Sequence, residues 1–240
     1  MDHRKLAALA ALCAPGAQPA LAQDAIGTDR PGFSTGPDTV GLGTVQVEAG
    51  FEWSDASNQT AFPLALLRYG VGEATEVRLT WNGVSVGDGP DGTLGGSVAV
   101  KHALAEGDGL RPALGLLAAV SIPAGSDPLD PEAGFLWSLS PSEAWSVFGT
   151  ATVGLTSSDG SHDVVGTNAV GVSRTLGPRA GVFVEHFVSW TEGDPDQTHY
   201  VDGGLTYLVT DDLQLDVNAG VSVGDTDAGT FVGGGLACRF

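Results

Sequence analysis

The chain has 240 residues and a formal net charge of −19. A strongly acidic chain is a poor partner for the phosphates of nucleic acids, so we expect no nucleic-acid binding. After the N-terminal stretch, no window offers the ~18 consecutive apolar residues that indicate a membrane-spanning helix.

Residues 1–22 have the features of a cleaved signal peptide. Two basic residues precede the apolar run Leu6–Ala14, and Ala20-Leu21-Ala22 is a small-x-small cleavage site. We therefore predict export and cleavage after Ala22, which leaves Cys238 as the one cysteine and permits no intramolecular disulfide. The alternative is a lipoprotein signal acylated at Cys13, but the bulky Leu12 before it disfavours that reading.

Beyond residue 42, apolar and polar residues alternate in long segments. Thr44–Trp53 places Val45, Val47, Ala49, Phe51 and Trp53 on one side, and Asp212–Val223 repeats the pattern. Strict alternation over about ten residues indicates a strand with one apolar and one polar face. About twelve such segments follow one another, near residues 43–53, 60–69, 75–84, 94–103, 111–121, 132–139, 144–155, 165–175, 178–190, 199–208, 212–223 and 230–240.

The connections between these segments alternate between tight turns, such as Gly177-Pro178, and longer acidic loops, such as residues 123–131. Outer-membrane barrels are built in this way, and a closed barrel leaves no strand edge unpaired in lipid. We predict an all-β fold: a closed antiparallel transmembrane β-barrel of 12 strands over residues 43–240, with short periplasmic turns and longer acidic extracellular loops. A secreted β-sandwich is the alternative, but it would not keep tryptophans and tyrosines mostly near strand ends.

Two stretches, Ile26–Trp53 and Pro63–Gly83, resemble the outer-membrane transporter family associated with the MetA pathway of phenol degradation. The resemblance rests on Thr28-Asp29-Arg30-Pro31, Gln46, Glu48, Gly50, Leu67-Arg68-Tyr69-Gly70, Glu76, Arg78 and Leu79. It implies a porin-like barrel in the outer membrane of a Gram-negative bacterium. It also implies passage of small, often hydrophobic or aromatic, molecules.

Alternation assigns a set of charged residues to the inside of the predicted barrel and hence to a permeant pathway. The set is Glu48, Glu52, Arg68, Glu76, Arg78, Lys101, Glu185 and Asp216. One reading is a charged constriction that selects permeants. The other is an ion-pair network that fills a narrow barrel, as side chains often do in small barrels.

Glu185 and His186 are adjacent, so alternation turns only one of them inward. His186 shares its parity with Val182, Val184 and Trp190, which makes Glu185 the inward residue. A bulge between the two would instead turn both inward. The facing of this pair therefore stays open.

Both ends of the mature chain carry a further prediction. Residues 23–42, rich in glycine and proline, are expected to be irregular and either to trail in the periplasm or to dock in the lumen as a plug. Docking is favoured because Asp29 and Arg30 belong to the family resemblance.

At the C-terminal end of the chain, a strand continues to Phe240. Gly235, Cys238 and Phe240 resemble the C-terminal signal of the barrel-assembly machinery, with Cys238 on the lipid side.

No enzyme activity, cofactor or metal site is expected. His162 and His199 have hydroxyl neighbours but no surrounding nucleophile motif, and Ser158–Asp163 lacks the ligand spacing of a cation site. The expected partners are outer-membrane lipid, lipopolysaccharide (bridged by divalent cations to the acidic loops), the barrel-assembly machinery and a small-molecule permeant. The hypothesis is a passive channel, with a non-conducting structural or adhesive barrel as the alternative.

Overall fold

The computed structural model describes residues 25–89, 91–125, 128–158, 161–224 and 226–240. The expected signal peptide, residues 1–22 with Cys13, lies outside these described residues. The described part of the chain is built of strands, turns and irregular segments. No helix in it is long and apolar enough to cross a membrane.

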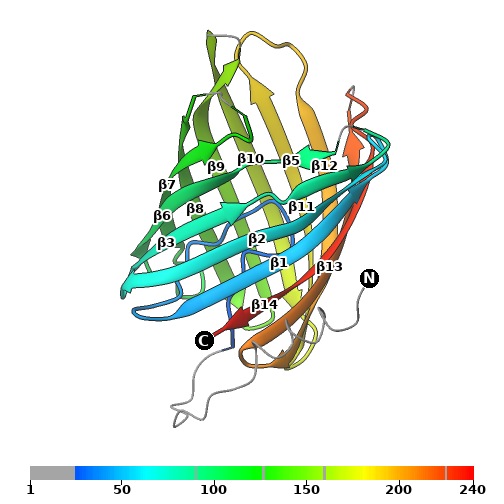
Figure 1. Cartoon of the computed structure of the whole chain (residues 1–240). Helices are drawn as coiled ribbons and strands as arrows, with labels where there is room; N and C mark the ends of the chain where they lie inside the picture. Colours follow the sequence, from blue (N-terminus) through cyan, green and yellow to red (C-terminus); the bar gives the residue numbers. More distant parts are fainter. Residues whose placement is uncertain (1–24, 90, 126–127, 159–160, 225) are drawn as a thin grey trace.

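Twelve long antiparallel strands form a closed barrel (Figure 1). β1 pairs with β14 on one side and with β2 on the other, which closes the sheet. The fold class predicted from alternation is confirmed. The barrel strands are β1 (Val45–Ser54), β2 (Gln59–Gly72), β3 (Thr75–Trp81), β6 (Gly96–Ala105), β7 (Ala113–Ile122), β8 (Asp130–Ser142), β9 (Trp145–Ser158), β10 (Ser161–Thr175), β11 (Ala180–Thr191), β12 (Thr198–Thr210), β13 (Leu213–Val223) and β14 (Thr230–Arg239).

The third barrel strand is shorter than predicted, and a small ladder follows it. β3 ends at Trp81, not at residue 84, because Gly83 turns the chain with a φ of 79°. β4 (Val84–Gly87) then pairs with Gln59–Phe62 of β2, and β5 (Gly92–Thr93) pairs with β4. The N-terminal part of β2 extends past Trp81, the last residue of β3. β4 therefore supplies the hydrogen-bonding partner that this part of β2 would otherwise lack.

The connections differ somewhat from the predicted alternation of short and long. Tight turns at residues 73–74, 143–144 and 211–212 lie on one rim, but the connection 106–112 on the same rim is longer and contains the bridge Asp108–Arg111. On the opposite rim, β1 and β2 extend further than predicted and shorten their loop to residues 55–58. Loop lengths therefore depend on how far each pair of strands continues, which alternation alone leaves uncertain by a few residues.

Burial along the strands follows a period of two. On β6, Val98 and Val100 are 41% and 44% exposed, whereas Ala99 and Lys101 between and after them are 6% and 0% exposed. The exposed parity carries valine, leucine and aromatic residues, and much of the buried parity is polar or charged. This inverts the pattern of a soluble protein and is the pattern expected of a barrel surrounded by lipid.

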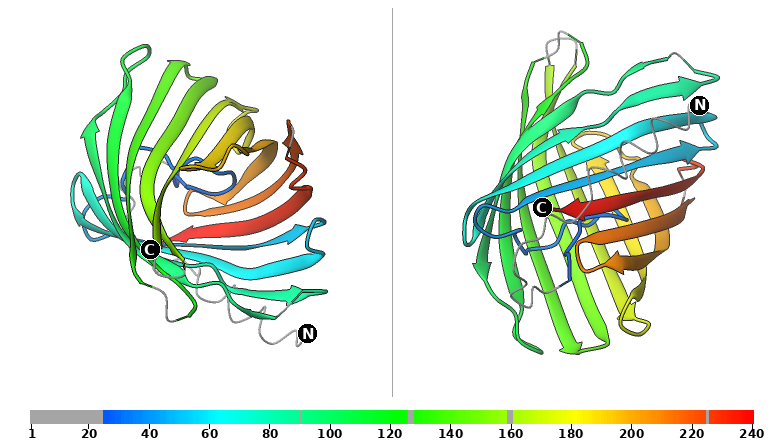
Figure 2. Two further views of the ribbon diagram at one scale, coloured as in Figure 1. Left: turned by 90° about the horizontal axis from the view of Figure 1, so that it is seen from above. Right: turned by 60° about the horizontal axis from the view of Figure 1, so that its bottom comes forward.

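Residues 25–44, called the N-terminal segment below, have no regular secondary structure and lie inside the barrel (Figure 2). At one end the Ile26 N–H donates to the carbonyl of Asp211, in the turn between β12 and β13. At the other end the Gly43 N–H donates to the carbonyl of Gly70 on β2. The segment therefore crosses the lumen before the chain enters β1.

Candidate functional site

Asp29 of the N-terminal segment lies among three cations from the barrel wall. Its carboxylate accepts a hydrogen bond from Arg78, and its Oδ2 lies 3.5 Å from Lys101 Nζ and 3.9 Å from Arg68 Nη1. Burial opposes ionisation of Asp29, but the fields of Arg68, Lys101 and Arg78 together outweigh it. They hold the pKa of Asp29 well below its usual range. Asp29 is therefore a negative charge at the centre of the group.

Two wall carboxylates complete what we call the charged cluster: Asp29, Glu48, Arg68, Glu76, Arg78 and Lys101. Arg68 donates from Nε to Glu76 at 2.9 Å and from Nη1 to Glu48 at 3.2 Å. Glu76 Oε1 also lies 3.1 Å from Arg78 Nη1 and 3.4 Å from Lys101 Nζ. Three carboxylates thus face three cations, which is the condition under which charges are retained in a buried site.

The charged cluster also binds the backbone of the N-terminal segment. Glu48 accepts the N–H groups of Asp29 and Arg30, with 3.0 Å between Arg30 N and Glu48 Oε2. Lys101 donates to the carbonyl of Gly36 at 3.1 Å. Inward side chains of β1 and β6 therefore satisfy polar backbone groups that no strand ladder pairs.

Arg30 is anchored on the other side of the lumen. Its Nη2 lies 3.0 Å from Oδ1 of Asp216 on β13. A Cβ atom added at Gly50 would lie 2.4 Å from Arg30 Nη2, and one added at Gly235 would lie 2.6 Å from Arg30 Nε. Glycine at these two wall positions therefore leaves the room that the guanidinium occupies.

The three residues of the proposed C-terminal signal face different ways. Cys238 and Phe240 share the outward parity of Val232, and Phe240 is 53% exposed. Cys238 is only 3% exposed, so the lipid-facing position predicted for it is covered; its register partners Val47 and Leu213 flank it. Gly235 has the opposite parity, toward Arg30.

Glu185 on β11 holds the middle of the N-terminal segment. Its two carboxylate oxygens accept the N–H groups of Phe33 at 2.6 Å and Ser34 at 3.0 Å. The Phe33 ring stacks on Phe187 with 4.1 Å between ring centroids. Glu185 is 1% exposed, and its fixed position makes it a second charged anchor.

His186 faces outward and is exposed, as alternation indicates. The register of β11 with both neighbouring strands is continuous, so the bulge that would turn both residues inward is not formed. His186 Nε2 lies 3.2 Å from Nδ1 of His199, which shares the outer face. The remaining predicted residue, Glu52, is inward and half-buried, and no ion pair joins it to the charged cluster among the described contacts.

Some inward neutral side chains that hold the N-terminal segment were not among the residues predicted from the sequence. Thr150 Oγ1 accepts the Thr35 N–H and donates to the Thr35 carbonyl, both at 2.9 Å. Gln214 Nε2 donates to Thr28 Oγ1 at 2.8 Å. Both lie at inward parity, so the alternation that selected the charged residues could have found them had neutral side chains been counted.

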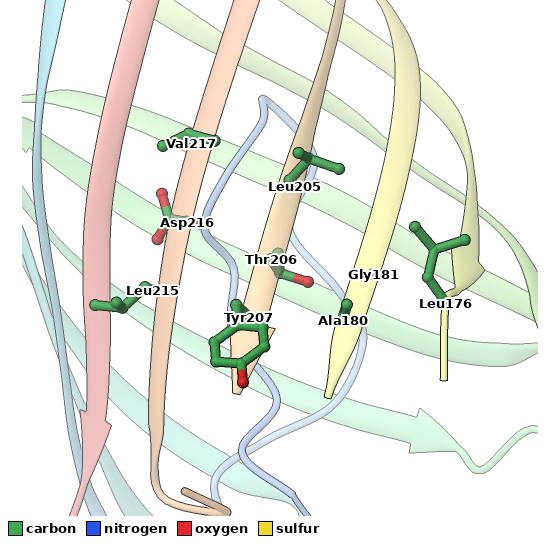
Figure 3. Close-up of a pocket in the computed structure, with 9 residues that line it drawn as sticks. All are labelled: Leu176, Ala180, Gly181, Leu205, Thr206, Tyr207, Leu215, Asp216 and Val217. Carbon is green, nitrogen blue, oxygen red and sulfur yellow. The ribbon is translucent and has the colours of Figure 1, made fainter. Parts of the chain in front are cut away.

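A polar cavity of about 430 Å³ remains between the N-terminal segment and the wall. Its wall side comes from β8 to β13, and its inner side comes from residues 28–38 of the segment. A different pocket, of about 360 Å³, lies across β11, β12 and β13 (Figure 3). It is lined by Leu205, Tyr207, Leu215 and Val217, which are about half exposed, so this pocket belongs to the apolar outer face.

Solved outer-membrane channels share this fold. The COG4313 outer membrane channel from Pseudomonas putida F1 superimposes with a TM-score of 0.66 at 10% identity, covering 85% of this chain and 98% of that one. The NanC porin gives a TM-score of 0.58 at 12% identity, with coverage of 82% and 98%. The KdgM porin in complex with disordered oligogalacturonate gives 0.57 at 10% identity, with coverage of 82% and 99%.

A search of curated protein sequences found no match. A family profile described as "Putative MetA-pathway of phenol degradation" matches residues 28–240. The matched range contains the N-terminal segment from Thr28 onward and the whole barrel, which agrees with the resemblance seen in the sequence. The chain therefore belongs to the MetA-pathway phenol-degradation family of outer-membrane β-barrels.

Proposed function

We propose that this protein is a passive outer-membrane channel for small molecules, hydrophobic and aromatic ones among them, and that the N-terminal segment is a plug that narrows its lumen. The polar cavity of about 430 Å³ beside the segment carries the proposal. A barrel filled entirely by its own side chains would have no such space. The shared fold with channels and porins supports the same role.

The plug role rests on how the N-terminal segment is held. Ion pairs from Asp29 and Arg30, and hydrogen bonds to Glu185 and Thr150, fix it at several points around the lumen. Each contact joins the segment to a different strand. A segment held on several sides reduces the cross-section of the lumen without sealing it.

The surroundings follow from the two faces of the barrel. The apolar outer face is proposed to lie in outer-membrane lipid after export and assembly by the barrel-assembly machinery. The acidic loops would adjoin lipopolysaccharide through divalent cations. Transport rather than catalysis is proposed because the charged side chains of the lumen are occupied in holding the N-terminal segment.

Planar-bilayer recording of the purified protein tests the channel role. Stable single-channel conductance is expected from the wild type. Absence of conductance in the wild type and in the Arg78→Ala/Lys101→Ala variant would overturn the proposal and favour the non-conducting structural barrel. Heat-modifiable mobility on gels verifies that each preparation is a folded barrel.

A further inference from the structure

The charged cluster is poorly placed to meet a solute. Lys101, Glu76 and Glu48 are 0% exposed, and Arg68 is 2% exposed. Their hydrogen-bonding atoms are directed at one another and at the N-terminal segment. A solute passing through the lumen would therefore contact other residues.

We infer, on the basis of the channel function proposed above, that solutes pass through the polar cavity between the N-terminal segment and β8–β13. We infer further that this cavity selects uncharged solutes that present hydroxyl groups. It is called the hydroxyl passage below. The permeant would then contact residues other than the predicted charged set.

The wall of the hydroxyl passage is rich in small hydroxyl side chains. Its serines and threonines come from neighbouring strands: Ser138, Ser140, Ser146, Ser173, Thr175 and Thr206. Such side chains both donate and accept hydrogen bonds, and they are short enough to leave space. The rings of Phe148 and Phe183 lie on the same wall and offer an apolar surface beside these hydroxyls.

The charges that border the hydroxyl passage are engaged elsewhere or exposed. Asp29 pairs with three cations, and Arg30 pairs with Asp216. Arg174 places its guanidinium over the Trp145 ring, 5.2 Å from the centroid, and Asp38 is exposed. Of these charges only Arg174 and Asp38 have no ion pair in the described part of the chain. They are of opposite sign, so the passage favours neither anions nor cations, whereas a neutral hydroxylated solute would exchange hydrogen bonds there at little cost.

Ser173 on β10 offers the direct test, with Thr167 as its matched control. Both residues have inward parity on the same strand, but only Ser173 lines the passage. Proteoliposome swelling in arabinose, an uncharged polyhydroxylated probe, should slow about fivefold or more in Ser173→Trp, because the indole occupies the cavity. Thr167→Trp should retain wild-type swelling.

The possible outcomes separate the two proposals. If wild-type protein causes no swelling and no conductance, the channel function itself is wrong. If the wild type is active and Ser173→Trp swells equally fast, only the hydroxyl passage is overturned.

A second variant keeps the test decisive if Ser173→Trp fails to fold. Ser173→Cys treated with a bulky methanethiosulfonate reagent should lose swelling activity, and the wild type given the same reagent should not, since its Cys238 is 3% exposed. Unchanged flux in fully labelled Ser173→Cys would also overturn the inference.

Discussion

Two halves of the barrel wall treat the N-terminal segment differently. The charged half, β1–β3 with β6, buries six formal charges in the charged cluster and grips the segment through them. The hydroxyl half, β8–β12, touches the segment mainly through neutral groups and Glu185 and leaves the hydroxyl passage open. The charged residues of the lumen therefore hold the N-terminal segment, and the small neutral ones line the space that is left beside it.

The physical reason lies in the cost of burying charge. A buried ion is stable only when it is paired and hydrogen-bonded, so a dense group of charges closes on itself and excludes solutes. Neutral hydroxyls carry a far smaller desolvation cost and tolerate both solvent and solute. In this barrel the densest group of charges therefore holds the N-terminal segment and does not line the hydroxyl passage.

The largest effect is expected from removing the central anion of the charged half. Asp29→Ala leaves three buried cations facing two carboxylates, and breaking a buried pair in this way costs about 3–5 kcal/mol. We expect the segment to leave the lumen and single-channel conductance to rise severalfold.

Glu73→Ala is the control for that variant. Glu73 is also a carboxylate, but it is exposed in the turn between β2 and β3 and lies outside both the charged cluster and the hydroxyl passage, so conductance should stay at the wild-type level. Equal conductance in Asp29→Ala and wild type would contradict the assignment of the charged half as the anchor.

An intermediate effect is expected at the one charged anchor of the hydroxyl half. Glu185→Gln keeps a single amide oxygen for two N–H groups, so one hydrogen bond to a charged group is lost, at about 1.5–3 kcal/mol, and the other becomes a weaker neutral bond. Hydrogen–deuterium exchange at the Phe33 and Ser34 amides should accelerate while the barrel strands stay protected. Unchanged exchange at these amides would show that Glu185 does not hold the segment.

A smaller effect is expected at the neutral anchor. Thr150→Val preserves side-chain shape but removes both hydrogen bonds to Thr35, at about 1 kcal/mol each. Exchange at the Thr35 amide should rise by less than it does at Ser34 in Glu185→Gln. A larger rise in Thr150→Val would reverse the ranking of the two anchors.

The smallest effect is expected from mild acid. Because the folded-state pKa of Asp29 is lowered, its contribution to docking is present above the ordinary aspartate pKa of about 4 and is lost only as pH falls through the lowered value. Exchange protection at the Asp29 amide, corrected for intrinsic rates, should therefore persist from pH 7 to pH 5. Loss of protection over that range would contradict an ionised Asp29.

Much of the fold could be predicted because alternation in sequence is a direct record of the two faces of a strand. Lys101 is 0% exposed and its neighbour Val100 is 44% exposed, so the two lie on opposite faces of the sheet, as the alternation in the sequence predicts. The β4–β5 ladder could not be predicted, because it depends on β2 being longer than its partner strand β3 at its N-terminal end. Strand ends likewise depend on partners that lie elsewhere in the chain.

For the lumen, alternation placed Glu48, Arg68, Glu76, Arg78, Lys101, Glu185 and Asp216 at inward parity, where the structure buries them. Parity states which face a residue occupies but not which inward residues meet across the lumen. Asp29 meets Arg78 and Lys101 because the segment crosses the interior, and no spacing in the sequence encodes that crossing. The reason for glycine at positions 50 and 235 is likewise seen only in the structure, where a Cβ atom at either position would clash with the Arg30 side chain.

Composition and local period were enough to predict an acidic all-β chain with long alternating strands and the inward parity of its charges, and a resemblance in a few motifs indicated its family. Which charges pair, where the N-terminal segment lies within the ring of strands and where space is left beside it depended on the tertiary structure. Pairing and empty space arise from contacts between distant strands, and those contacts exist only once the barrel has closed.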